Sequence, residues 1–206
     1  MACGLLITFA MAYLTATTSL IYLVDSLYLV LTIAELALVF VLSSRVQTMS
    51  VGAARATFFG YALLNGMVLS YYFLAFDLGT LGAGFPCHLA VLRSDGSLRH
   101  HHPQRSVRLG PKLMMALFAL IITGFVGVLF GMGFMGTVLY SGIGLVVFML
   151  LTAYDTQKLQ QMYSYYSADA EMAEKASIYG ALTLYLDFIN IFLYVVRLMG
   201  NNRRRS

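Results

Sequence analysis

Long apolar runs dominate this chain of 206 residues and leave few folds open to it. A helix that crosses a bilayer needs about 20 mostly apolar residues, within a range of about 17 to 25. Because lipid offers no hydrogen bonds, the backbone must satisfy its own polar groups, and the runs lack the alternation of barrel strands. The sequence therefore predicts an all-α, polytopic membrane helix bundle. Its membrane segments are expected at residues 4–24, 27–43, 57–76, 112–132, 134–154 and 178–198.

Composition supports a membrane protein and excludes several other classes. The chain is 60% hydrophobic and 11% charged, whereas soluble domains are about 45–50% apolar and about 25% charged. Its net charge of +4 fits loops that face an anionic leaflet and says little about nucleic acid. No phosphate-binding glycine loop, G-x-S-x-G or H-E-x-x-H motif occurs. We expect no enzyme activity, no bound cofactor and no nucleic-acid partner.

One polar segment, residues 77–110, interrupts the apolar pattern of what we expect to be a single membrane domain, 1–206. It reads "DLGTLGAGFPCHLAVLRSDGSLRHHHPQRSVRLG", which is basic, contains histidines and is broken by prolines. The triplet His100–His102 does not predict a metal site, because successive side chains diverge and metal ligands are usually spaced apart. Cys87 and Cys3 are too few for a disulfide scaffold.

An acid, Asp187, lies near the middle of the last run, "GALTLYLDFINIFLYVVRL". A charge at the centre of a membrane helix costs about 2.5–3.5 kcal/mol on insertion scales. Helix positions three, four and seven apart share a face, so Asp187 lies on one stripe with Gly180, Thr183, Asn190 and Tyr194. The rest of the segment is almost all apolar. This one-sided polarity predicts that the stripe meets other helices or water, and that Asp187 has a partner.

Two other acids are candidate partners. Asp155 ends the preceding run in "LLTAYDTQKL", and Glu35 lies within "LTIAELALVF". Two neighbouring carboxylates can share a proton and titrate as a pair, and their oxygens also suit a calcium ion. Arg45 could neutralise one acid as a salt bridge. The residues alone leave a second interpretation open, in which a backbone group, an arginine or interfacial water satisfies each acid separately.

Two segments resemble a known family. "AYDTQKL" followed by "YGALTLYLDFINIFLYVVRLMG" resembles the C-terminal signature of the Bax inhibitor-1 family, also called the transmembrane Bax inhibitor motif family. "IAELALVFVLSSRVQTMS" is similar to the second helix of its bacterial members. The resemblance covers residues 1–76 and 109–200. It implies seven membrane helices, with the last enclosed by the other six, and a place in the bacterial inner membrane.

The resemblance also implies a function. Family members are described as pH-sensitive calcium-leak channels, and their aspartate pair corresponds to Asp155 and Asp187, which would form a proton-controlled gate for calcium. Arg45 is the nearest match to an arginine that latches one aspartate. Glu35 and Asn190 are further candidates for support. Some bacterial members bind a membrane-anchored ATP-dependent protease, so the alternative function is a non-conducting regulator of such a protease.

Residues 77–108 depart from the family pattern, which has a fourth apolar helix there. The composition changes abruptly, the length is preserved, and family-like sequence resumes at "LGPKLMMALFALI". These features predict a frame-shifted segment and a fourth helix that is disrupted or missing. A chain with that defect could also be a non-functional remnant.

Overall fold

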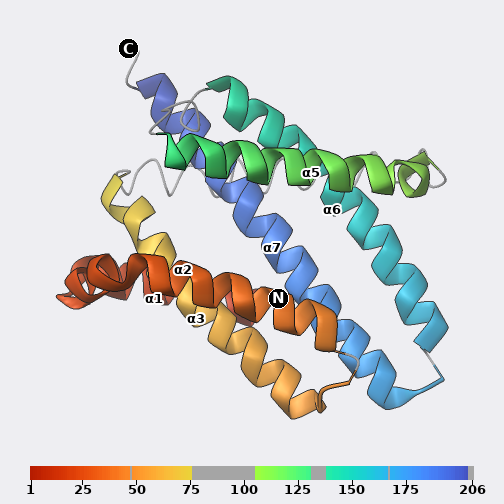
Figure 1. Ribbon diagram of the computed structural model, residues 1–206. Coiled ribbons are helices and arrows are strands. Elements are labelled where there is room, and N and C mark those ends of the chain that lie inside the picture. Colours follow the sequence, from red (N-terminus) through yellow and green to blue (C-terminus); the bar gives the residue numbers. More distant parts are fainter. Residues whose placement is uncertain (47, 76–104, 131–137, 167, 204–206) are drawn as a thin grey trace. The chain divides into compact units, whose positions relative to one another are not determined.

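The described part of the protein is built from helices (Figure 1). A computed structural model describes residues 1–46, 48–75, 105–130, 138–166 and 168–203. The predicted all-α architecture is confirmed for these residues. The prediction of a missing fourth helix falls mostly on residues 76–104, which lie outside them. The helices are α1 (Ala2–Thr17), α2 (Leu20–Arg45), α3 (Val51–Ala75), α5 (Arg105–Leu129), α6 (Val138–Tyr166) and α7 (Ala170–Arg203).

Four of these helices are long and apolar enough to cross a bilayer. They are Leu20–Arg45, Val51–Leu74, Val138–Tyr166 and Ala170–Gly200, judged by length and composition within the described ranges. The apolar stretches Ala2–Thr17 and Gly110–Gly124 are shorter. The predicted polytopic character is therefore confirmed, with four full-length spans among the six predicted segments.

The boundary between the first two helices differs from the prediction. The sequence predicted runs 4–24 and 27–43, but α1 ends at Thr17 and α2 begins at Leu20. The hydroxyls of Thr17 and Thr18 donate to the carbonyl oxygens of Tyr13 and Leu14, at 2.9 and 2.7 Å. The same side-chain bond occurs inside α2 at Thr32, so these bonds accompany the end of α1 and do not explain it. The hydropathy pattern placed the break at the charged Asp25, but Asp25 lies inside α2.

Helix α6 also extends further than predicted. The sequence placed Asp155 at the end of its run, 134–154, whereas α6 continues eleven residues beyond Asp155, to Tyr166. The extension "TQKLQQMYSYY" contains no glycine or proline, and glutamine, lysine, leucine and methionine are good helix formers. A hydropathy criterion follows the apolar core of a span and misses its polar helical continuation. α7 then begins at Ala170, where Asp169 Oδ1 accepts the N–H groups of Glu171 and Met172.

The chain divides into two compact units. Unit 1 comprises Met1–Asp77 and Gln161–Tyr185, and unit 2 comprises Leu78–Gln160 and Leu186–Ser206. α6 and α7 contribute to both units.

The centre of unit 1 is the contact between α1 and α3. Every third or fourth residue on one face of α1 is small and buried: Gly4, Thr8, Ala12 and Thr15. A Cβ atom on Gly66 of α3 would lie only 2.6 Å from the carbonyl oxygen of Thr8. Small residues allow helix backbones to approach closely inside a membrane, where packing drives association. The stripe therefore fixes how closely these two helices pack.

Candidate functional site

Asp187 lies inside unit 2 on α7, where 5% of its surface is exposed. The next two residues, Phe188 and Ile189, are also buried. Asn190, from the same predicted stripe, donates its side-chain N–H to the carbonyl oxygen of Leu186 at 2.8 Å. The polar stripe is thus turned into the protein at Asp187, while Asn190 satisfies one amide donor on its own helix.

The contact between α6 and α7 in unit 2 is built around Tyr194. Its ring lies 5.8 Å from that of Phe148, at an interplanar angle of 38°. A Cβ atom on Gly144 would overlap the same ring, so glycine provides the space for it. Leu151 and Ile191 belong to the same buried cluster. These contacts define which turns of α6 and α7 face each other.

The register of this contact relates the two predicted gate residues. α6 ends at Tyr166 and α7 begins at Ala170, so the chain reverses direction between them (Figure 1). Asp155 follows Phe148 by seven residues, and Asp187 precedes Tyr194 by seven residues. Seven residues make about two helical turns and return to the same face. On antiparallel helices both steps run in the same direction. The register therefore puts Asp155 and Asp187 at one level of the α6–α7 contact.

Asp155 is half-buried, and its surroundings on α6 are polar. The hydroxyls of Thr152 and Thr156 donate to the carbonyl oxygens of Phe148 and Thr152, each at 2.8 Å. Their protons are thus used within their own helix. The exposed Lys158, almost one turn further, attracts the carboxylate of Asp155. Asp155 is thus the more accessible acid of the two, with a cation nearby on its own helix.

Arg45, the predicted latch, is the last residue of α2 and is exposed. It belongs to unit 1, and Asp155 and Asp187 belong to unit 2. Within the described part of unit 1 its side chain forms no ion pair. Its role as a latch stays a prediction.

Glu35, the other predicted partner, is half-buried on α2 in unit 1. Its Oε1 accepts a hydrogen bond from Asn65 Nδ2 at 2.5 Å, and the Tyr61 hydroxyl also hydrogen-bonds its side chain. Its support of the aspartate pair stays a prediction. The sequence argument did not identify Asn65 and Tyr61. Their signal was available in "YALLN", where two polar groups lie four residues apart inside an apolar run.

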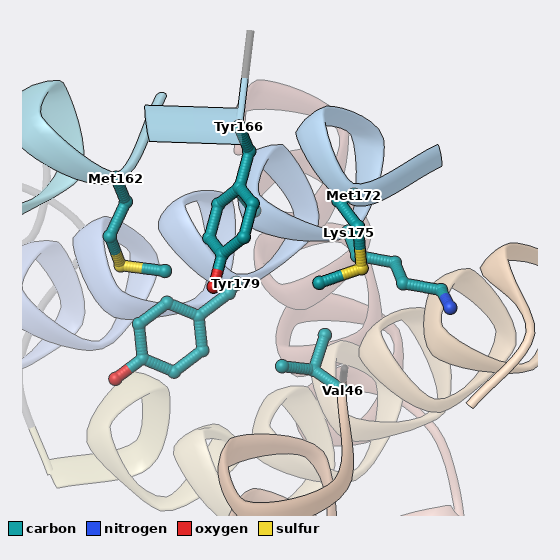
Figure 2. Close-up of a pocket in the computed structure, with 7 residues that line it drawn as sticks. Val46, Met162, Tyr166, Met172, Lys175 and Tyr179 are labelled. Atoms are coloured by element: carbon teal, nitrogen blue, oxygen red, sulfur yellow. The ribbon is translucent and has the colours of Figure 1, made fainter. Parts of the chain in front are cut away.

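A pocket in unit 1 lies between the tip of the α6–α7 hairpin and the end of α2 (Figure 2). Its lining includes Met162, Tyr166, Met172 and Tyr179. Lys175 also lines it, but Figure 2 shows the side chain extending away from the two tyrosine rings, and its Nζ lies 2.8 Å from a Glu171 oxygen. The lining is thus mainly apolar.

The described ranges contain no group of three histidine, cysteine, aspartate or glutamate side chains that could hold a metal ion. His100–His102 and Cys87 lie outside those ranges. The expectation that they bind no metal stays a prediction.

The α6–α7 register can be tested through two glycines of α6. Gly144→Leu is expected to destabilise the protein by about 1–3 kcal/mol, because the added side chain overpacks the Tyr194 ring. Gly142→Leu is the matched control, since a Cβ there meets nothing within 4 Å. Thermal unfolding in detergent measures both variants. Equal melting temperatures for the two would contradict this register.

Comparison with known proteins identifies relatives over nearly the whole chain. The family model described as "Inhibitor of apoptosis-promoting Bax1" matches residues 1–204. The "Inner membrane protein YbhL" of Escherichia coli K12 is 37% identical over 210 residues, which cover 98% of this chain and 88% of the relative. An uncharacterized protein of Deinococcus radiodurans is 39% identical over 219 residues, covering 98% of this chain and 87% of the relative.

These matches agree with the resemblance of the last two helices and extend it along the chain. A family model that spans residues 1–204 leaves little of the 206 residues outside it. The relatives are bacterial, and the described helices include four of membrane-spanning length. The chain therefore belongs to the Bax inhibitor family and is an integral protein of the bacterial inner membrane.

Proposed function

We propose that this protein is a calcium-leak channel whose conductance is controlled by protonation of Asp155 and Asp187. The observation that carries the proposal is the α6–α7 register, which brings the two acids to one level, each seven residues from the Phe148–Tyr194 ring contact. The family resemblance of the segments that contain both acids supports the same assignment.

The chemistry of two carboxylates suits this role. Calcium takes hard oxygen ligands, including carboxylates, at about 2.3–2.6 Å. Two ionised carboxylates held close together repel each other and tend to share a proton. A shared proton or a calcium ion removes that repulsion. Loss of the proton restores it and favours a different arrangement of α6 and α7.

The proposal predicts calcium flux into liposomes that depends on pH. Asp187→Asn is expected to flatten this dependence, because asparagine keeps the size of the side chain but cannot exchange a proton. Fluorescent calcium indicators inside the vesicles measure the flux.

Asp25→Asn provides the control for a general loss of negative charge. Asp25 is an exposed acid of unit 1 that accepts a hydrogen bond from the Tyr71 hydroxyl at 2.8 Å, and asparagine can still accept it. This variant should keep the wild-type pH profile. Absence of flux at every pH would instead favour the non-conducting regulator, and co-purification with a membrane-anchored ATP-dependent protease would support that alternative.

A further inference from the structure

A further acid within a membrane helix, Glu35, has hydrogen-bonding partners of its own in unit 1. It lies near the middle of α2, a helix of 26 residues that buries only Val24 and Leu42 along its length. Glu35 accepts a hydrogen bond from Asn65 at 2.5 Å, and the Tyr61 hydroxyl hydrogen-bonds it as well. A helix that buries little of its surface thus places one carboxyl group against two polar groups of α3.

No positive side chain compensates Glu35 within the described part of unit 1. That unit holds three basic side chains, Arg45, Arg55 and Lys175. Arg55 forms an ion pair with Glu174, and Lys175 pairs with Glu171. Arg45 lies ten residues further along α2, which is about 15 Å of helix. Only hydrogen bonds would therefore stabilise the negative charge of an ionised Glu35. Charges within membrane helices are usually paired with an opposite charge.

Asn65 has one hydrogen-bonding atom unused. It is 6% exposed, and its Nδ2 donates both to Glu35 and, at 3.0 Å, to the Tyr61 hydroxyl. Its Oδ1 is buried without a hydrogen-bond partner. A buried acceptor in this state costs about 1–3 kcal/mol. The site therefore contains an unused hydrogen-bond acceptor on Asn65, beside a carboxyl group without a counter-charge.

The tyrosine of α7 closes this site on another side. Tyr185 is fully buried, and its ring lies 5.7 Å from that of Tyr61. Its hydroxyl lies 2.5 Å from Thr8 Oγ1, which in turn lies 3.0 Å from the carbonyl oxygen of Ala62. Because the Thr8 proton goes to a backbone carbonyl, Tyr185 donates its own proton to Thr8. Glu35 therefore receives hydrogen bonds from α3 and none from Tyr185.

We propose that Glu35, Asn65 and Tyr61 form a proton-binding site in unit 1 that is separate from the Asp155–Asp187 pair. When Glu35 takes up a proton, its new O–H group donates to the Asn65 side-chain oxygen after the amide rotates. The Tyr61 hydroxyl then donates to the remaining carboxyl oxygen. The Asn65 oxygen thereby gains a partner, and no net charge remains in the apolar part of the helix pair.

A proton fits this cluster better than a metal ion does. The site offers one carboxylate, whereas calcium sites combine six to eight oxygen ligands. The two groups that face Glu35 present N–H and O–H donors, which a metal ion would have to displace. A sodium ion is the remaining monovalent candidate, and the experiment separates it from the proton.

Infrared difference spectroscopy between acidic and alkaline pH tests the proposal on the full chain in lipid nanodiscs. The Asp155→Asn/Asp187→Asn double variant serves as the background, so that this pair contributes no signal and the outcome does not depend on the channel proposal. We expect a carbonyl-stretch band of a buried protonated carboxyl group that disappears on Glu35→Gln. Asp25→Asn, which changes an exposed acid, should leave that band in place.

Tyr61→Phe supplies a second variant that keeps the ring and removes only the hydroxyl. We expect it to move the band to higher frequency, because a carbonyl group that loses a hydrogen bond vibrates faster. A band that Glu35→Gln does not change, or that Tyr61→Phe does not move, would overturn the proposal. A band whose pH titration vanishes when sodium is replaced by choline would assign the site to sodium and would also overturn it.

Discussion

A Gly66→Leu protein is expected to lose roughly 3 kcal/mol of stability, because this change overpacks the α1–α3 contact. A side chain at Gly66 would meet the Thr8 carbonyl oxygen at 2.6 Å and the Met11 Cβ at 2.7 Å. The first of these is backbone and cannot rotate away, so α1 must move. That movement would break the bond between Thr8 and Tyr185 as well. For a protein of this size, the loss corresponds to a melting temperature lower by about 6–12 °C.

Gly60→Leu is the matched control on the same helix. A Cβ at Gly60 meets nothing within 4 Å, and the helix-propensity change from glycine to leucine is the same at both positions. Thermal unfolding of both variants in one detergent separates packing from propensity. A Gly66→Leu melting temperature at or above that of Gly60→Leu would show that α1 and α3 are not packed through this contact.

The fold could be predicted in its class and less well in its boundaries. Run length and composition predicted a membrane helix bundle, because a lipid-exposed backbone has few alternatives. Helix ends depend on local chemistry that hydropathy does not register. The end of α1 at Thr17 is not marked by hydropathy, and the residues after Asp155 continue α6 because several of them favour helix. The close approach of α1 and α3 at Gly66 could not be predicted either, because run length does not show which helices pack together.

The site could be predicted in part. Asp187 was identified from the cost of an acid in lipid and from the polar stripe around it, and it is buried in the structure. The sequence could not predict that Asp155 and Asp187 lie at one level, because sequence spacing does not give the register between two helices. The Phe148–Tyr194 contact provides that register. Asn65 and Tyr61 were missed as partners of Glu35, because a contact between α2 and α3 depends on how the helices pack.

Asp155→Asn is expected to remove the pH dependence of calcium flux as completely as Asp187→Asn does, and the double variant should add nothing. Two acids that share one proton titrate as a unit, so the loss of either leaves no pair. Effects of residues that act together are not additive. Two independent sites would behave differently, because each single variant would remove only its own part of the response.

The most direct measurement of this coupling is calcium flux into liposomes across a series of pH values for the wild type, both single variants and the double variant. The account predicts a pH-dependent wild type, three flat profiles that coincide, and a wild-type profile for Asp25→Asn. A double variant whose loss equals the sum of two smaller single losses would contradict a shared proton. An Asp155→Asn protein with the wild-type profile would exclude Asp155 from the gate.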